Sequence, residues 1–159
     1  MAKLNLTRPL AFFDVETTGL SISSDRIVEI SILKIFPPDG GRKESKNILI
    51  NPTIPIPKEV TKIHGISDID VADAPTFKDC AKELSDFFGD SDLAGYNCNY
   101  FDIPLLMEEF LRAGIDFEMK DRKMVDVQGI FHKKEERTLS AAYKFYCGKT
   151  IENAHSAEA

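Results

Sequence analysis

Alternating apolar and polar positions predict three strands in the first third of the chain. Leu10–Glu16 is rich in apolar and aromatic residues and leads into a turn at Gly19, and Ile27–Phe36 alternates with an excess of β-branched residues. Both patterns are typical of strands, whose side chains point alternately to opposite faces. Pro37–Gly41 is a tight connection, and Lys46–Asn51 would form the third strand. Short connections between successive strands indicate an antiparallel meander.

The spacing of apolar residues becomes helical beyond Pro52–Pro57, a segment that its prolines hold extended. Two short apolar runs, Leu93–Tyr96 and Met124–Val125, predict the remaining strands. Apolar residues three and four apart predict three helices, each ending at or beside a glycine: 77–89, 104–113 and 138–147. The order βββαβαβα predicts a three-layer α/β fold with a mixed five-stranded sheet flanked by helices.

Length and composition indicate an ordinary soluble protein. A chain of 159 residues suits a single domain, and 43% hydrophobic with 29% charged residues is a globular composition. No run of about 18 apolar residues predicts a membrane span, and the first residues lack a signal-peptide apolar region. Three widely spaced cysteines, Cys80, Cys98 and Cys147, fit neither a disulfide framework nor a zinc site. We therefore expect buried free thiols and a cytoplasmic location.

The net charge of −6 and the pI of about 5.1 argue against a protein that grips long nucleic acid through a basic face. They do not exclude an enzyme that takes only the end of a strand. Such a site can be acidic when bound metal ions supply the positive charge.

Asp14 and Glu16 are the first candidate functional residues. On a strand, residues two apart point to the same face, so both carboxylates project together. Two like charges repel, and a divalent cation relieves that repulsion; oxygen ligands select Mg²⁺ or Mn²⁺. Alone, the pair is a weak signal, because charged pairs are usually solvated. It gains weight from the apolar Leu10–Phe13 before it and the Thr17–Leu20 turn after it, whose amides can approach a ligand closely.

Asp102 and His155 are weaker candidates when each is taken by itself. Asp102 begins a predicted helix, where an N-cap or first-turn carboxylate is common. A single histidine such as His155 carries no information from its spacing.

Four segments, in order, resemble the DEDDh 3′→5′ exonucleases, the group that includes the bacterial DNA polymerase III proofreading (epsilon) subunit. Phe12–Leu20 resembles the first exonuclease motif. Asn51–Pro57 with Ile63–Ile66 resembles the loop and short helix that follow the third strand. Gly95–Asn97 with Phe101 and Asp102 resembles the second motif, and His155 resembles the histidine of the third. Each match is weak alone, but the set covers nearly the whole chain and is highly specific.

The resemblance implies a ribonuclease H-like fold and two-metal hydrolysis of a terminal phosphodiester. Asp14, Glu16 and Asp102 would hold two divalent cations, Mg²⁺ or Mn²⁺, and His155 would be the general base, so these four residues would be catalytic. The terminal nucleotide would lie against the following residues: Thr17, Thr18, Gly19, Leu20, His64, Asn97 and Phe101. For Leu20 and Phe101, plain packing in the core is the alternative interpretation.

The third motif of the family has an aspartate five residues after its histidine, at what would be position 160. The chain ends at Ala159, and Glu158 stands at the wrong spacing to replace it. We therefore expect residues 1–159 to be a single exonuclease domain that lacks its final metal-ligand aspartate and last helix, to belong to a longer natural protein, and to have weak or no activity by itself. A non-catalytic nucleic-acid or protein-binding module on the same fold is the alternative. The expected partner is the single-stranded 3′ end of DNA or RNA; the sequence does not distinguish these, and no polymerase-binding segment is legible.

Overall fold

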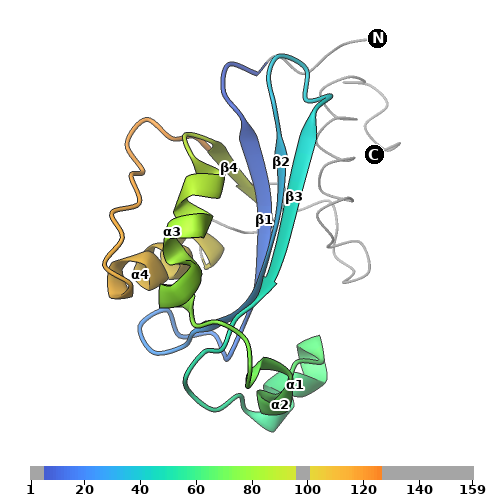
Figure 1. The fold of residues 1–159 in the computed structure, drawn as a ribbon, viewed down its shortest axis with the longest axis vertical. Helices are drawn as coiled ribbons and strands as arrows, with labels where there is room; N and C mark the ends of the chain where they lie inside the picture. Colours follow the sequence, from blue (N-terminus) through green and yellow to red (C-terminus); the bar gives the residue numbers. More distant parts are fainter. Residues whose placement is uncertain (1–5, 96–100, 127–159) are drawn as a thin grey trace.

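The computed structural model describes residues 6–95 and 101–126. Figure 1 shows the elements in space. The strands and helices, in chain order, are β1 (Leu10–Thr17), β2 (Ile27–Ile35), β3 (Lys43–Leu49), α1 (Lys58–His64), α2 (Asp68–Val71), α3 (Phe77–Phe88), β4 (Asp92–Gly95), α4 (Asp102–Arg112) and β5 (Met124–Asp126).

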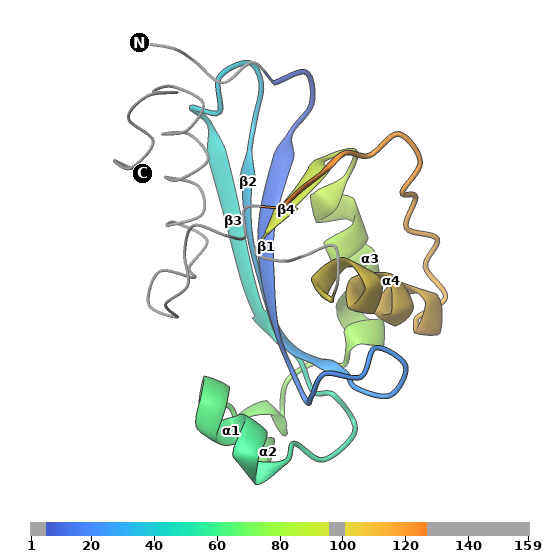
Figure 2. The same cartoon turned by 180° about the vertical axis from the view of Figure 1, so that it is seen from behind.

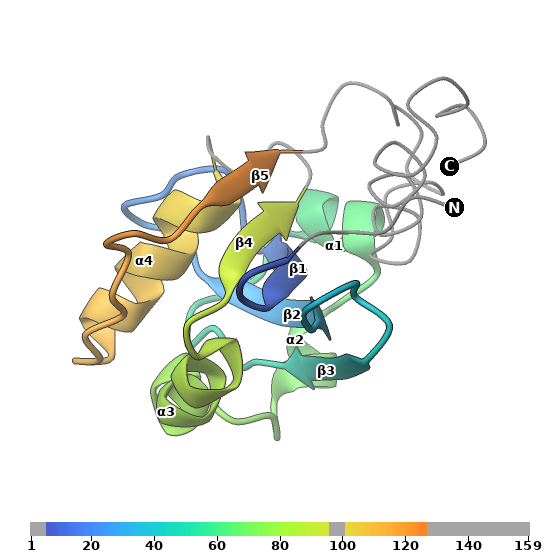
Figure 3. The ribbon, with the colours of Figure 1, turned by 90° about the horizontal axis from the view of Figure 1, so that it is seen from above.

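The strands form one mixed sheet in the order β3-β2-β1-β4-β5. β1, β2 and β3 are antiparallel neighbours, as the predicted meander requires. β4 lies parallel to β1, and β5 lies parallel to β4. Figure 3 shows this arrangement from above, with β1 in the middle of the sheet. β1 is therefore the strand on which both halves of the sheet are built.

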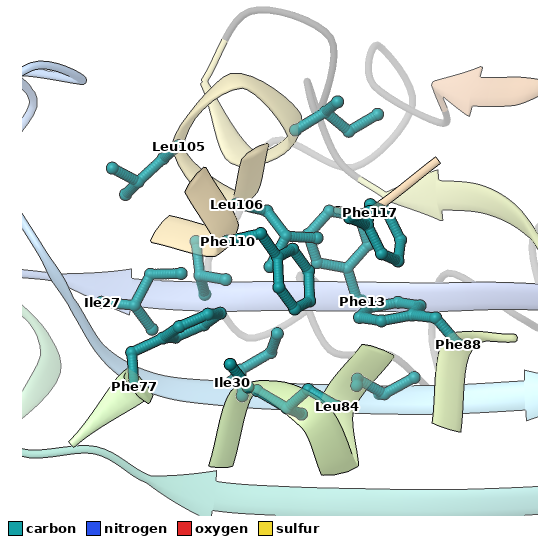
Figure 4. Packing of buried hydrophobic residues seen from close by; sticks show 14 of the residues in the cluster. Phe13, Ile27, Ile30, Phe77, Leu84, Phe88, Leu105, Leu106, Phe110 and Phe117 are labelled. Carbon is teal, nitrogen blue, oxygen red and sulfur yellow. The ribbon is translucent and has the colours of Figure 1, made fainter. Parts of the chain in front are cut away.

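Helices α3 and α4 cover one face of this sheet, as Figures 1 and 2 show from opposite sides. The side chains of β1 that face them are Ala11, Phe13 and Val15, all buried in the main core cluster. Figure 4 shows the aromatic residues of that core. Phe110 stacks on Phe117 with ring centroids 4.5 Å apart and meets Phe77 edge to face at 5.2 Å. These offset and edge contacts are the favourable geometries for aromatic pairs.

The third strand begins earlier than the apolar pattern predicts. The β2–β3 turn is closed where the amide of Phe36 donates to the carbonyl of Arg42 at 3.0 Å, so pairing starts at once with Lys43 opposite Ile35. The first residues of β3 are polar and exposed, because β3 is an edge strand and needs no buried face there. Alternation therefore gave no signal for them.

Between β3 and α3, residues 52–57 form no helix or strand, where the sequence predicts a proline-rich loop. Two short helices then follow, whereas the resemblance implies one. α1 is capped at its C-terminal end by Gly65, whose φ of 80° a glycine adopts without strain. α2 is preceded by the N-cap Ser67, which forms a capping box with Asp70. The Ser67 amide donates to Asp70 Oδ2 at 2.9 Å, and the Asp70 amide donates to the Ser67 carbonyl at 3.0 Å. α1 and α2 lie at the end of the sheet, apart from α3 and α4 (Figure 1).

Of the three cysteines, Cys80 is described and is a buried free thiol, as predicted. Burial, with the neighbouring Glu83 next in effect, raises the pKa of Cys80 to about 11. The predictions for Cys98, Cys147 and the helix over 138–147 concern residues outside the described ranges. None of the helices in residues 6–95 and 101–126 has the length and apolar character needed to cross a bilayer.

Phe110 and its neighbour Leu111 test how much the aromatic core contributes. Phe110 is 1% exposed, so Phe110→Ala should lower the free energy of unfolding by about 3–5 kcal/mol, through lost burial and the cavity left behind. Leu111 is 71% exposed, and Leu111→Ala should change it by less than about 0.5 kcal/mol. Urea unfolding measures both, and similar losses in the two variants would contradict the packing described.

Candidate active site

Asp14 and Glu16 lie near the end of β1 and are partly exposed, whereas Phe13 and Val15 between and beside them are buried. The pleat thus places both carboxylates on one face, as the sequence predicts, and this is the face opposite α3 and α4. Both residues also interact with other groups in the folded chain.

Glu29 is an acidic residue of this face that the sequence analysis did not single out. It stands directly opposite Glu16 in the antiparallel register of β1 and β2. Like charges opposite each other in a sheet are destabilising, so the position favours a nearby cation. Only the pairing register shows this, because Glu16 and Glu29 belong to different strands. Within the described ranges, no group of three or more His, Cys, Asp or Glu side chains is arranged so that it could hold a metal ion.

Asp102 is the first residue of α4 and is 8% exposed. Phe101 occupies the N-cap position, so the first-turn interpretation of Asp102 is correct and the N-cap interpretation is wrong. A carboxylate in the first turn of a helix is stabilised by the positive end of the helix dipole. β4, which leads toward this helix, runs parallel to β1 with Ala94 opposite Phe12. The chain therefore leaves the sheet beside the segment of β1 that carries Asp14.

The turn after β1 is held by the carboxylate of Asp25. Its Oδ1 accepts a hydrogen bond from Thr18 Oγ1 at 2.8 Å, and its Oδ2 accepts one from the amide of Ser21 at 2.8 Å. The backbone closes the turn as well, since the Thr18 amide donates to the Arg26 carbonyl at 2.9 Å. A Cβ on Gly19 would lie 2.5 Å from Asp25 Oδ2, so only glycine fits without displacing that carboxylate. Asp25 thus shapes the predicted nucleotide-binding turn, a role that its spacing in the sequence does not reveal.

His64, the last residue of α1, bridges two backbone segments. Its Nδ1 lies 3.1 Å from the amide nitrogen of Ile66, and its Nε2 lies 3.0 Å from the Thr17 carbonyl oxygen. Because the Ile66 amide can only donate, Nδ1 must be unprotonated and Nε2 carries the hydrogen. The neutral ring therefore donates to Thr17 and fixes α1 to the end of β1.

Leu20 and Phe101, the two apolar residues expected to contact the nucleotide, differ in burial. Leu20 is 86% exposed, so core packing is the wrong interpretation for it. Phe101 is partly buried and packs against the main core, in agreement with that alternative. Asn97 and His155 lie outside the described residues, so their expected roles stay predictions.

Comparison with known proteins assigns the chain to a family. The sequence model described as "Exonuclease" matches residues 11–159, nearly the whole chain. The chain belongs to the exonuclease family. Exonucleases of this family depend in general on divalent metal ions.

Two relatives of this exonuclease-family chain are DNA polymerase III epsilon subunits. The subunit of Treponema pallidum is 33% identical over 156 residues, which cover 92% of this chain and 68% of the relative. That of Buchnera aphidicola is 30% identical over 153 residues, covering 92% and 60%. A PolC-type DNA polymerase III of Caldanaerobacter subterraneus is 31% identical over 119 residues, covering 74% of this chain and 8% of the relative. The chain thus spans between a small fraction and about two thirds of these relatives.

Solved structures confirm the fold. Exonuclease I from an exonuclease I–SSB-Ct complex superposes with a TM-score of 0.76 at 15% identity, covering 96% of this chain and 43% of that one. Escherichia coli exonuclease I bound to a 5cy-dA13 oligonucleotide gives 0.68 at 18% identity, covering 76% and 28%. The predicted ribonuclease H-like fold, with its mixed five-stranded sheet flanked by helices, is therefore correct.

Gly19→Ala tests the turn. The new methyl group would collide with Asp25, so we expect the hydrogen bonds from Thr18 and Ser21 to weaken and the free energy of unfolding to fall by about 1–2 kcal/mol. Amide hydrogen exchange of Ser21 should accelerate beyond what the global loss explains. Gly41→Ala is the control, because its Cβ would lie 3.1 Å from Asp39 in the remote hairpin. Equal acceleration of Ser21 in both variants would count against this role of Gly19.

Proposed function

We propose that this chain is the catalytic domain of a 3′→5′ exonuclease that hydrolyses terminal phosphodiesters and releases nucleoside monophosphates. The observation that carries the proposal is that Asp14 and Glu16 lie on the same face of β1, near its end, and are partly exposed, in a chain of the exonuclease family. The turn Thr17–Leu20, held by Asp25, follows directly in the chain, and the terminal nucleotide would lie on it beside the carboxylates.

The chemistry of these residues fits a hard divalent cation. Carboxylate oxygens are the ligands that Mg²⁺ and Mn²⁺ prefer. The opposed Glu16 and Glu29 make this face more acidic than the two motif residues alone, which increases the attraction for a cation. Asp14, Glu16 and Asp102 would hold two such ions. When bound, the ions stabilise the charge that develops on the attacking and leaving oxygens.

His155 is proposed as the general base that accepts a proton from the attacking water. A neutral imidazole has a reference pKa of about 6.5, which suits proton transfer near pH 7.

The terminal nucleotide is proposed to lie on Thr17, Thr18, Gly19 and Leu20, with contributions from His64, Asn97 and Phe101. The exposure of Leu20 supports a contact with a base, since a large apolar side chain directed to solvent can pack against any base. His64 would act mainly through Thr17, because both of its ring nitrogens are engaged by backbone groups.

Single-stranded DNA with a free 3′ end is the proposed substrate. The epsilon relatives are subunits of a DNA polymerase, and one of the structural neighbours is exonuclease I in complex with an oligonucleotide. A polymerase partner for the natural protein is proposed on the same grounds. The acidic net charge is compatible with an enzyme that handles a strand end and makes few phosphate contacts.

The direct test uses the complete protein, Mn²⁺ and a 5′-labelled single-stranded DNA, with a matched RNA in parallel. We expect stepwise shortening from the 3′ end, release of mononucleotides, and loss of both on adding EDTA. Asp14→Ala should lower the rate more than about 100-fold, because even residues that only support metal ligands contribute 10–100-fold.

Asp116→Ala, at an exposed position in the loop after α4, is the matched control and should keep the wild-type rate. Binding of the labelled strand without any shortening would contradict the proposed enzyme and favour the non-catalytic binding module. Faster shortening of the RNA would instead overturn the proposed substrate.

A further inference from the structure

Helix α4 is joined to the turn after β1 by two charged residues that the motifs do not include. Arg112, the last residue of α4, donates from Nη2 to the carbonyls of Ile22 at 3.2 Å and Ser23 at 2.9 Å, and from Nη1 to that of Asp25 at 3.2 Å. Its guanidinium therefore holds three carbonyl groups of one short turn. A planar fork with fixed donors can do this, whereas a lysine ammonium on a flexible stem cannot reach all three in the same way.

Glu109 completes the arrangement from inside the protein. It is 2% exposed, its Oε2 accepts a hydrogen bond from the amide of Ile27 at 2.9 Å, and its Oε1 accepts one from Arg112 Nη1 at 3.3 Å. Burying a carboxylate costs free energy, and such a pair is often no more stable than apolar residues of similar volume. Its contribution is therefore better sought in the geometry that it fixes than in stability.

That geometry reaches the proposed nucleotide site through Asp25 and Ile27. Asp25 has its carbonyl held by Arg112 and its carboxylate bonded to Thr18 and Ser21. Ile27, held by Glu109, is the register partner of Thr17. Both ends of the turn are thus fixed to one helix, which is itself anchored in the core by buried residues such as Phe110.

We infer that Glu109 and Arg112 are positioning residues, which hold the turn 17–26 against α4 and so present Thr17–Leu20 to the terminal nucleotide. The inference rests on the proposed exonuclease function. Asp14 and Glu16 are fixed separately by the β1 pleat, and Asp102 by the packed start of α4. Glu109 and Arg112 together form a clamp on this turn. Loss of the clamp should therefore weaken substrate binding more than it slows the chemical step.

Arg112→Lys keeps the charge and removes the fork. In the complete protein with Mn²⁺ and single-stranded DNA, we expect KM to rise about tenfold or more, with kcat falling less than about threefold. Glu109→Gln keeps an acceptor for the Ile27 amide and loses the charge that orients Arg112. Glu109→Gln should also raise KM, by a smaller factor. It replaces Arg112→Lys in the test if the lysine variant does not fold.

Arg122→Lys is the matched control. Arg122 also holds three carbonyls, those of Gly89, Ser91 and Glu118, but near the start of β4, the end of the parallel strands away from Asp14. A purely structural role predicts that both lysine variants lower the fraction of active molecules and leave KM unchanged. That result, or an equal rise of KM in both, would overturn the inference.

The rate of hydrogen exchange at the backbone amides of Thr18 and Ser21 tests the inference without measuring enzyme activity. It should accelerate in Arg112→Lys and stay unchanged in Arg122→Lys. If the wild-type protein releases no nucleotide, the proposed function fails, and the exchange comparison still decides whether the clamp orders the turn. Unchanged exchange in Arg112→Lys would overturn the inference even in an active enzyme.

Discussion

The pleat of β1 is the constraint on which the rest of the site depends. Phe13 and Val15 are buried against α3 and α4, so Asp14 and Glu16 must point to the other face. A slip of one residue in the pairing of β1 would turn Asp14 and Glu16 into the core beneath α3 and α4, where two carboxylates cannot replace Phe13 and Val15. The position of the carboxylates is therefore determined by hydrophobic packing on the opposite side of the sheet.

Helix α4 packs in the same core and positions other parts of the proposed site. Its first residue is Asp102, its middle is held by Leu106 and Phe110, and its last residue is Arg112. Eleven helical residues span about 16 Å, so one rigid element connects the second motif to the turn that follows the first. Charged and polar contacts then set the details of that turn, where Asp25 accepts from the Ser21 amide and His64 binds the Thr17 carbonyl.

Most of the fold follows from local patterns. The alternation of β2 and the apolar stripes of α3 and α4 were visible in the sequence, because each element buries one face against the same core. Prediction failed where burial was not periodic. The polar start of β3 is an exposed edge, and α1 and α2 are short helices whose ends are fixed by Gly65 and by the Ser67–Asp70 box. These segments are formed by local hydrogen bonds or lie at an exposed edge, so their sequences carry no periodic pattern of apolar residues.

The sequence by itself determined the mixed sheet, the shared face of Asp14 and Glu16, and, through the resemblance of its motifs, the exonuclease family. Only the tertiary structure decided that Glu29 opposes Glu16, that Asp25 shapes the turn at Gly19, and that Leu20 is exposed. It alone showed Glu109 and Arg112 reaching a turn more than 80 residues away along the chain. The reason is physical: strand periodicity and motifs are properties of neighbouring residues, whereas register, crowding and long-range hydrogen bonds exist only after distant segments have packed together.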